Sequence, residues 1–358
     1  MSISEKEVIG SLLAVWRPPA GLSSQEWAEQ NRVLDSSISG IPGKYKAVVT
    51  PYMIQVMKAA DDPETTLLVG RKSSQIAWTE TINNVLGAKI AEDPCNIMMA
   101  FPSQLNASDY VSEKFKPFVK STPSLLSKIG DPDKTSWRRY SFAGGFVKFV
   151  TGGSAKSIKS TPAPLLIVEE PSEMQEYLET QGDAITLFTE RQKTFPDSMR
   201  LLIFGGSPKD KGFCPVDTAY EGTCKYYYVV PCHACGGFHE LAFENMFYEE
   251  FAEGKDDPKY GKIDPKTATY KCPHCKELWT DKQKNINVLK AIDYNDNGWI
   301  KERPEKLAEI GFRFNELLSP FQGSSFIELA KKKITAEKHL AMGKDSKMRV
   351  FVNNGLGY

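Results

Sequence analysis

Five short apolar runs recur between positions 65 and 206, and each ends in, or is followed by, small or polar residues. They read TTLLVG, NIMMAF, FVKFV, PLLIVEE and MRLLIFGG. Runs that are apolar throughout, rather than at alternate positions, suit strands that are buried on both faces of a parallel sheet. Patterns typical of helices lie between them, at 79–92 and 105–120. The alternation predicts an α/β fold with a central, mostly parallel sheet and crossover helices.

The length and the spacing of these patterns predict three regions. With 358 residues, 41% of them hydrophobic, the chain is long enough for one large core and an accessory module. Residues 1–60 read as an N-terminal lead-in with helical stretches at 24–33 and 51–60. We expect the α/β core to comprise residues 61–229 and 284–358. Residues 230–283 interrupt the pattern and are interpreted as an inserted module.

The charge balance limits how the chain can contact nucleic acid. Forty-five basic residues balance forty-five acidic ones. This argues against a passive nucleic-acid coat, which needs a standing excess of Lys and Arg, so any DNA contact must be local. The sequence contains no apolar run near the roughly 20 residues that span a bilayer, and its start lacks the pattern of a signal peptide. We therefore expect a soluble, intracellular protein without a membrane partner.

A phosphate-binding loop is predicted where the first strand meets a helix, because a helix N-terminus presents free backbone N–H groups to an anion. Compared with the pattern G-x-x-x-x-G-K-[ST], Thr79 keeps the hydroxyl expected to bind magnesium, but Ala77 replaces the second glycine and Trp78 replaces the lysine. Lys72 or Arg71 is the candidate for the missing charge. An ordinary strand–turn–helix junction is the alternative. The candidate nucleotide-binding residues are Arg71, Lys72, Ser73, Ser74, Gln75, Ile76, Ala77, Trp78, Thr79 and Glu80.

Two carboxylates follow the fourth apolar run. Glu169 and Glu170 end the segment PLLIVEE. In a nucleotide hydrolase the first acid holds magnesium and the second orients the attacking water. An ordinary strand end that happens to carry two acids is the alternative. The last run leads into Ser207, a position where motor ATPases sense the γ-phosphate, although the segment alone is compatible with any loop.

Four of the seven cysteines form two CxxC pairs, and these are the strongest single signal in the sequence. Cys232 with Cys235 and Cys272 with Cys275 are separated by 36 residues. Each CxxC knuckle supplies two thiolates, and two knuckles complete the tetrahedral ligand set of a structural zinc ribbon. Free or redox-active thiols are the alternative. We expect His233 and His274 to be spare ligands at best, His239 to lie on the surface, and Cys95, Cys214 and Cys224 to be buried free thiols.

Three groups of basic residues are candidates for contact with DNA phosphates. The groups are Lys114, Lys116 and Lys120 on one predicted helix; Arg138, Arg139, Lys156 and Lys159 in loops; and Lys331, Lys332 and Lys333. For the third group, a solvated helix face is the favoured interpretation.

Taken in order, the motifs resemble the large terminase subunits of the phage lambda type, the GpA-like family of DNA-packaging motors. The stretches that carry this resemblance are spread over nearly the whole chain. They are Glu26-Trp27-Ala28, Pro51-Tyr52, Lys72-Ser73-Ser74-Gln75, Thr79-Glu80, Phe101-Pro102-Ser103, Glu169-Glu170, Arg191 with Thr194-Phe195, Gly206-Ser207-Pro208, the two Cys pairs, Gly311-Phe312, and FVNNGLG at 351–357.

The resemblance implies a RecA-like P-loop ATPase core of the ASCE class, with a role for each candidate residue. Lys72 would be a displaced phosphate-loop lysine, Thr79 and Glu169 would hold Mg²⁺, and Glu170 would be catalytic. Arg191, or a basic residue of a neighbouring subunit, would neutralise the γ-phosphate, and the Ser207 region would couple hydrolysis to movement. Two departures from the family pattern, Glu169 where Asp is usual and Ala77 in place of glycine, put the turnover rate in question.

The resemblance also implies cofactors and partners. They are ATP with Mg²⁺, a structural Zn²⁺, double-stranded DNA, a portal protein and a small terminase subunit, in a homo-oligomeric ring in the host cytoplasm. The nuclease domain of full-length terminases is expected to be absent, so no DNA cleavage is expected. Two other classes stay open. One is a helicase-like or remodelling ATPase, which would require a second lobe, and the other is a non-catalytic zinc-ribbon protein that binds DNA or acts as a scaffold.

Overall fold

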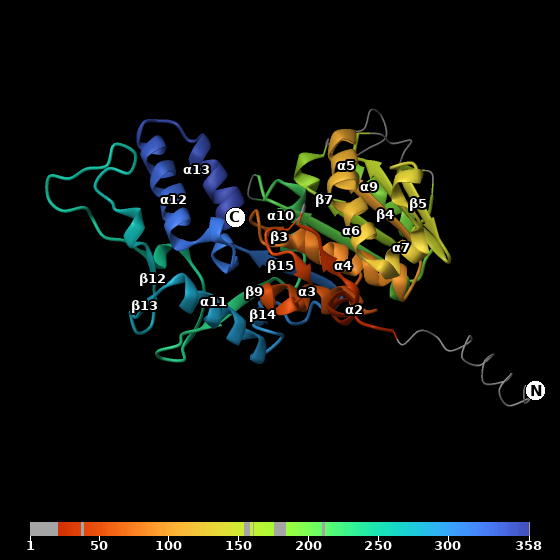
Figure 1. Ribbon diagram of the computed structural model, residues 1–358, viewed down its shortest axis with the longest axis horizontal. Coiled ribbons are helices and arrows are strands. Elements are labelled where there is room, and N and C mark those ends of the chain that lie inside the picture. Colours follow the sequence, from red (N-terminus) through yellow and green to blue (C-terminus); the bar gives the residue numbers. More distant parts are fainter. Residues whose placement is uncertain are drawn as a thin grey trace, which may run out of the picture.

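The computed structural model describes residues 21–36, 39–153, 158–159, 161–174, 184–209 and 212–357 (Figure 1). The first twenty residues of the expected lead-in lie outside these ranges, as does Lys156. None of the helices in the described ranges combines the length and the apolar character needed to cross a membrane.

A large mixed sheet forms the centre of the molecule. In the described residues its order is β10-β9-β15-β3-β8-β7-β4-β6-β5, with β14 beside β9. Every neighbouring pair from β9 to β6 is parallel, whereas β10 and β14 pair antiparallel with β9, and β5 with β6. The strands are β3 (Leu67–Lys72), β4 (Asn96–Phe101), β5 (Arg139–Phe142), β6 (Gly145–Thr151), β7 (Leu165–Glu169), β8 (Leu201–Gly206), β9 (Tyr226–Pro231), β10 (Phe238–Glu240), β14 (Trp299–Lys301) and β15 (Glu309–Phe314).

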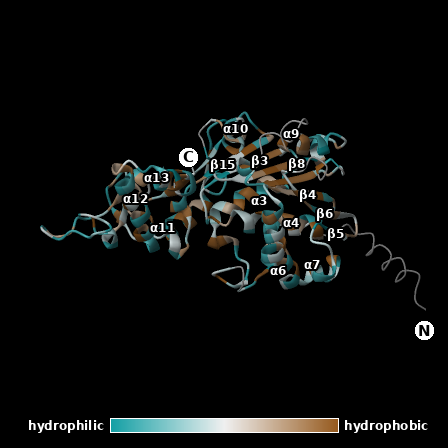
Figure 2. Cartoon of the chain, turned by 90° about the horizontal axis from the view of Figure 1, so that it is seen from above, coloured by the Kyte–Doolittle hydropathy of each residue, from teal (hydrophilic) through white to brown (hydrophobic). Residues whose placement is uncertain are grey.

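The five apolar runs become β3, β4, β6, β7 and β8, and the prediction of a mostly parallel central sheet is confirmed. These strands are brown in Figure 2, with more hydrophilic helices outside them. Successive residues face opposite sides: Leu68 belongs to one buried cluster and Val69 to the other. This explains why the runs are apolar at every position.

Helices cover both faces of the sheet. Buried residues of α2, α3, α4, α6 and α7 belong to the cluster on the Leu68 face, and those of α9 and α10 to the cluster on the Val69 face. The helices are α2 (Ser24–Asn31), α3 (Ile54–Asp61), α4 (Trp78–Ala91), α5 (Gln104–Tyr110), α6 (Lys116–Ser121), α7 (Pro123–Ile129), α9 (Ala184–Thr189) and α10 (Pro215–Glu221). A π-helical turn, η3 (Val111–Phe115), joins α5 to α6.

The described part of the expected lead-in packs directly on the core. A capping box formed by Ser23 and Glu26 starts α2. Trp27 of this helix is fully buried against Gly87 of α4, where an added Cβ would lie 2.1 Å from the indole. Helices α2 and α3 therefore contribute buried residues to the main hydrophobic core.

The cysteine-bearing segment extends one edge of the sheet. The expected boundary at residue 230 falls inside β9, and the first CxxC knuckle is the turn between β9 and β10. A small sheet follows, made of β11 (Met246–Phe247), β12 (Thr269–Lys271) and β13 (Leu278–Trp279). Helices α11 (Asp281–Lys290), α12 (Phe326–Ala341) and α13 (Ser346–Val350) lie on this side of the molecule, and a π-helical segment, η13 (Phe351–Leu356), continues α13 (Figure 1).

Candidate functional site

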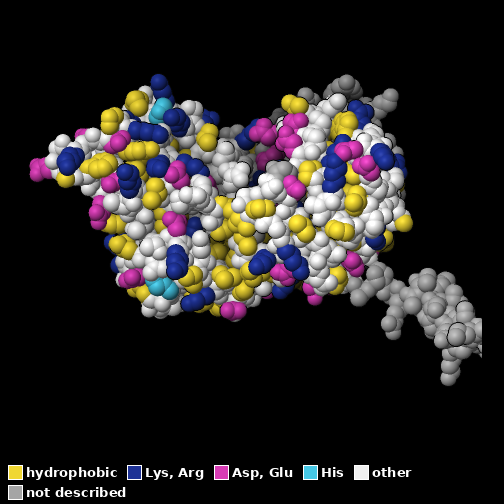
Figure 3. Space-filling view, in the orientation of Figure 1, with side chains coloured by type: hydrophobic (Ala, Val, Ile, Leu, Met, Phe, Trp, Pro, Cys, Tyr) yellow, Lys and Arg dark blue, Asp and Glu magenta, His cyan; other side chains and the backbone are white. Residues whose placement is uncertain are grey.

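The predicted functional segments meet at one edge of the sheet. Strand β8 lies between β3 and β7, with Arg71 paired to Gly206 and Glu169 paired to Gly205. The carboxyl ends of the three strands are therefore adjacent, which is where ligands bind in open α/β sheets. Figure 3 shows acidic side chains gathered in the hollow between the α5 and α12 sides of the molecule.

A lysine and a carboxylate from different strands form the centre of this site. Lys72 Nζ lies 2.6 Å from Glu170 Oε1, and the Ser207 N–H donates to Glu170 Oε2 over 3.0 Å. Glu170 takes a left-handed conformation with φ 50°, which turns its side chain back over the sheet end. One carboxylate thus connects the ends of β3 and β8.

The structure moves the start of the predicted loop. Arg71 and Lys72 are the last two residues of β3 rather than loop residues, and the turn runs from Ser73 to Ala77. Gln75 and Ala77 have positive φ values of 57° and 66°. Ala77, which stands where the loop pattern has its second glycine, thus occupies a conformation that favours glycine.

Helix α4 begins with free backbone donors. Ala77 is its N-cap and provides no side-chain cap, so no side chain satisfies the first N–H groups of this 14-residue helix. The N–H groups of Ser73 and Ser74 are already used, because they donate to the carbonyls of Phe314 and Asn354 over 3.0 and 2.8 Å. An anion at this turn would therefore be bound by the helix N-terminus and Lys72.

Trp78 is a structural residue of the site. Its indole is buried against the sheet, where a Cβ on Gly70 would lie 2.3 Å from Cζ3 and one on Gly205 would lie 1.9 Å from Nε1. The indole stands where the usual loop pattern has lysine, and Lys72 at the end of β3 is the lysine that lines the cavity along the turn. Trp78 also lines this cavity, and most of its side chain packs against the sheet.

Two cavities converge on Thr79. One of about 180 Å³ lies along the turn and is lined by Lys72, Ser73 and Thr79 among others. A larger one of about 680 Å³ lies over the end of β7 and is lined by Thr79, Glu169 and Glu170 among others. Thr79 and Lys114 line both cavities. Together they offer room for an elongated anionic ligand.

Glu169 fits the role of a metal ligand. Burial raises its pKa to about 7, although the charges of Lys72 and Lys114 lower it. Glu169 Oε1 and Ser73 Oγ are buried atoms with no hydrogen-bond partner among the described residues. Such orphaned oxygen atoms are expected where a ligand completes the site. A divalent cation there would favour the ionised carboxylate.

Two of the predicted nucleotide-binding residues, Arg71 and Glu80, form ion pairs with other parts of the chain. The buried Arg71 pairs with Asp217 at 2.8 Å and lies over the Tyr220 ring on the opposite face of the sheet. Glu80 lines the smaller cavity but is paired with Arg32. The Arg71 guanidinium therefore lies on the opposite face of the sheet from the cavities described above.

The structure also separates Arg191 from the site. The Arg191 carbonyl accepts from the Ala163 N–H, and its guanidinium donates to the Lys159 carbonyl. These contacts lie at the amino end of β7, whereas Glu170 follows its carboxyl end. Within one chain Arg191 therefore does not reach the phosphate site, because the length of the strand separates them.

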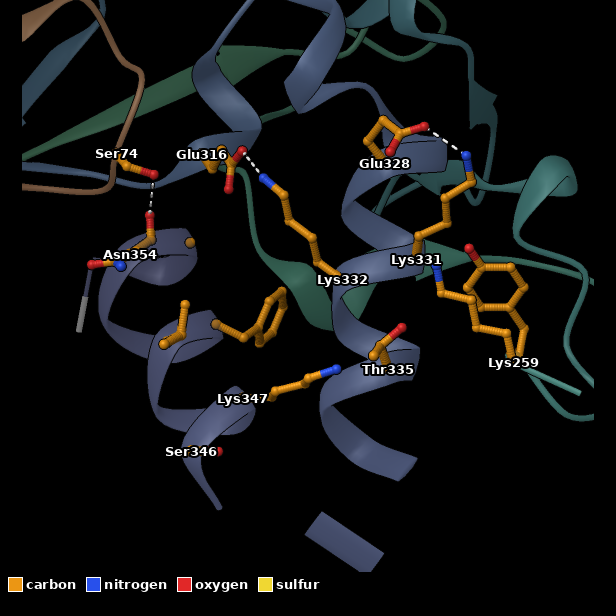
Figure 4. Close-up of a pocket in the computed structure, with 14 residues that line it drawn as sticks. Ser74, Lys259, Glu316, Glu328, Lys331, Lys332, Thr335, Ser346, Lys347 and Asn354 are labelled. Atoms are coloured by element: carbon orange, nitrogen blue, oxygen red, sulfur yellow. Dashed lines mark hydrogen bonds and ion pairs between the residues drawn. The ribbon is translucent and has the colours of Figure 1, made fainter. Parts of the chain in front are cut away.

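Ser74 lines a third cavity, which lies behind the turn. This cavity, of about 660 Å³, lies between α12 and the α13–η13 segment (Figure 4). Ser74 Oγ and N–H both approach the carbonyl of Asn354. The turn is thus supported by the C-terminal segment, which sequence patterns do not reveal because the two are 280 residues apart.

The four cysteines of the CxxC pairs converge. Their sulfur atoms all lie within 4.8 Å of one another, with Cys232 and Cys275 Sγ 3.7 Å apart and Cys235 and Cys272 Sγ 4.0 Å apart. Tetrahedral Zn–S bonds of about 2.3 Å place sulfur atoms roughly 3.8 Å apart, so the set fits a structural metal.

The histidines near this cluster have other partners. His233 is hydrogen-bonded through its two ring nitrogens to Asn287 and Gln283 of α11, and His274 approaches the Phe238 carbonyl. His239 is half-buried and stacks on Tyr270, so the expectation of a surface residue is wrong. Of the three remaining cysteines, Cys214 and Cys224 are buried as expected, whereas Cys95 is half-buried.

The basic groups divide according to their partners. Lys116 and Lys120 both pair with Asp133. Arg138 lies over Trp137, and Arg139 over Phe146. The third group is also engaged: Lys331 pairs with Glu328, Lys332 with Glu316, and Lys333 with Glu337, and Figure 4 shows the first two pairs.

The family model and the two relatives that match this chain are all phage terminase large subunits. The family model described as phage terminase large subunit gpA, ATPase domain, matches residues 39–293. The chain is 22% identical over 269 residues to the terminase large subunit of Enterobacteria phage P21, covering 72% of this chain and 39% of that protein. It is 21% identical over 373 aligned residues to the terminase large subunit of Escherichia phage lambda, covering 98% and 54%. The chain thus spans about half or less of these relatives.

A solved structure, the large terminase of bacteriophage HK97, matches with a TM-score of 0.45 at 15% identity, over 57% of this chain and 41% of that one.

Proposed function

The chain belongs to the family of the phage terminase large subunit gpA, ATPase domain, and from that premise we propose that it hydrolyses ATP to drive packaging of duplex DNA into a prohead. The observation that carries the proposal is the ion pair of Lys72 with Glu170, at the point where β3, β8 and the N-terminus of α4 converge. We assign the core to the RecA-like P-loop class on the same arrangement.

Binding of the triphosphate requires Lys72 to change partner. Its ammonium group leaves Glu170 for the phosphate oxygens, and the free N–H groups at the start of α4 complete the anion site. Mg²⁺, when bound, offsets charge on the phosphate oxygens, and Thr79 and Glu169 are the residues that would hold it.

Hydrolysis then depends on the carboxylate that Lys72 has released. Glu170 Oε1, no longer paired, accepts a hydrogen bond from the attacking water and orients it. Glu170 Oε2 remains the acceptor for the Ser207 N–H. This bond connects the catalytic carboxylate to the segment after β8, so a shift of Glu170 when the product phosphate leaves would also move Ser207. We therefore assign the coupling of hydrolysis to movement to that segment.

The cysteine cluster is proposed to hold a structural zinc ion. The four sulfur ligands would close the coordination sphere and leave no open position for catalysis. The proposed partners are duplex DNA, a portal protein and a small terminase subunit, with several copies in a ring in the host cytoplasm. In such a ring, a basic residue from a neighbouring copy is one further source of charge at the γ-phosphate.

Magnesium-dependent ATP hydrolysis, measured with and without duplex DNA, tests the proposal. We expect turnover that requires Mg²⁺, rises with DNA and is lost in Lys72→Ala. Thermal stabilisation by Mg²⁺–ATP separates this function from a non-catalytic zinc-ribbon protein, since a ligand that binds the folded state raises the unfolding midpoint. Absence of both hydrolysis and stabilisation would refute the ATPase assignment.

A further inference from the structure

Lys114 lies on a local distortion of a helix beside the proposed ATP site. The five-residue π-helical turn η3 separates α5 from α6. Such turns are rare and frequently occur at functional sites. Tyr110, on the preceding turn, is buried and donates a 2.5 Å hydrogen bond to Asn83 of α4. This bond fixes the helix on α4, the helix that begins at the phosphate-binding turn.

Lys114 lines the same cavity as the expected magnesium ligand Glu169. The smaller cavity runs along the turn that follows Lys72, and the larger one covers Glu169 and Glu170. Lys114 and Thr79 line both. A triphosphate that extends from the turn into the cavity over Glu170 would therefore pass Lys114 and Thr79.

The charge of Lys114 is not committed to a salt bridge. Among the described residues no ion pair involves it, whereas Lys116 and Lys120 on the same helical stretch share Asp133, and Lys72 is paired with Glu170. The larger cavity is strongly acidic. Its carboxylates are Asp109, Glu113, Glu169, Glu170 and Glu173, of which Glu173 is paired with Lys209. These carboxylates repel a phosphate that enters the cavity, and a lysine without a salt bridge offsets part of this repulsion.

We propose that Lys114 is a catalytic residue that binds a non-bridging oxygen of the γ-phosphate and stabilises its charge during hydrolysis. The inference rests on the proposed ATPase function. Water attacks the γ-phosphorus as its proton passes to the Glu170 carboxylate, the bond from that phosphorus to the β–γ bridging oxygen breaks, and ADP and phosphate leave. The Lys114 ammonium donates a hydrogen bond throughout and keeps its proton. It supplies, within the chain, the charge that Arg191 cannot bring from the far end of β7.

The test compares Lys114→Ala with Lys89→Ala, which removes a lysine in the last turn of α4 that pairs with Asp93. Removing one donor to the transition state costs about 100-fold or more in kcat. We expect a loss of that size in Lys114→Ala, partial recovery in Lys114→Arg, and wild-type kcat in Lys89→Ala. Lys114→Gln, which retains a polar side chain of similar length, provides the measurement if the alanine variant does not fold.

Binding of a transition-state analogue distinguishes a catalytic role from a structural one. We expect Lys114→Ala to bind ADP as the wild type does but ADP–aluminium fluoride much more weakly. If the wild type hydrolyses ATP and Lys114→Ala retains its kcat within threefold, the assignment of Lys114 is wrong and the ATPase function stands. If the wild type neither hydrolyses ATP nor binds ADP–aluminium fluoride, both proposals fail together.

Discussion

Lys72 Nζ and Glu170 Oε1 lie 2.6 Å apart although 98 residues separate them in the chain. In the ATPase that we propose, each of these groups has a different partner during the reaction: a phosphate oxygen for Lys72 and a water molecule for Glu170. The ion pair is therefore the resting arrangement, and nucleotide binding must break it. Breaking it costs free energy, which the new phosphate contacts have to exceed.

Glu170→Gln should abolish most ATP hydrolysis while retaining ATP binding. The neutral amide releases Lys72 from its ion pair, so the affinity for Mg²⁺–ATP should stay the same or increase. The kcat should fall about 10²- to 10⁴-fold, because an amide is a poor base for orienting water. Equilibrium binding of ATP together with single-turnover hydrolysis measures both quantities.

A nearby carboxylate provides the control for this variant. Glu173 lines the same cavity, but it is exposed and paired with Lys209. Glu173→Gln should leave kcat within a few fold of the wild type. Equal losses in the two variants would show that the general charge of the cavity matters rather than the position of Glu170.

Ala77→Gly should stabilise the protein. Ala77 has φ 66° and ψ 20°, and an L-residue in this region costs about 1–2 kcal/mol. The added freedom of glycine in the unfolded chain offsets about 0.5–1 kcal/mol of this. We expect a net gain of about 0.5–1 kcal/mol in the free energy of unfolding, measured with urea. Ala88→Gly, inside α4, should lose stability instead.

The sequence allowed the centre of the site to be predicted. The apolar runs identify the strands because the side-chain pattern of a doubly covered parallel strand is local. Lys72 and Glu170 follow from the rule that such strands carry their ligands at the carboxyl ends.

Other features depend on long-range pairing or on local distortion. Strand β15 is drawn from residues near the C-terminal end, yet it lies between β9 and β3 in the sheet, and its sequence alone does not reveal that place. Lys114 lies in a π-helical turn, which sequence periodicity does not predict, and a regular helix pattern groups it with Lys116 and Lys120. The support of Ser74 by Asn354 requires the folded chain.

Gly205→Ala should destabilise the core beneath the site. Its Cβ would lie 1.9 Å from Trp78 Nε1, so the indole must move, and overpacking of this kind costs about 1–3 kcal/mol. The double variant Gly205→Ala/Trp78→Leu should lose less stability than the sum of the losses in the two single variants. Urea unfolding of the wild type, the two single variants and the double variant measures this coupling. Gly323→Ala, where the new Cβ meets nothing within 4 Å, should be near neutral.

Cys272→Ser should remove the proposed zinc ion. Cys272 is buried, and its Sγ lies 4.0 Å from that of Cys235. With three thiolates left, we expect less than one metal ion per chain by elemental analysis and a loss of several kcal/mol in stability, because metal binding contributes directly to folding. Cys214→Ser, a buried thiol away from the cluster, should retain the metal. Full metal content in Cys272→Ser would contradict the four-cysteine site.

Lys284→Met should stabilise the protein at neutral pH and lose this advantage in alkali. Lys284 is buried on α11, donates to the Ser319 carbonyl at 2.7 Å, and burial lowers its pKa to about 8 from 10.5. Above pH 10.5 the amine is neutral in both folded and unfolded chains, so it carries no penalty. As the pH falls toward 8 the unfolded chain takes up the proton first, and the folded state loses stability; below 8 the penalty is constant.

The shift from 10.5 to about 8 corresponds to roughly 3 kcal/mol. Part of this is offset by the lost hydrogen bond to Ser319, so we expect a gain of about 1–2 kcal/mol at pH 7. Urea unfolding from pH 7 to 10.5 should show the gain shrinking steadily through this window. Lys290→Met, an exposed position on the same helix, should show no such pH dependence. A gain for Lys284→Met that is independent of pH would attribute the effect to packing rather than to the buried charge.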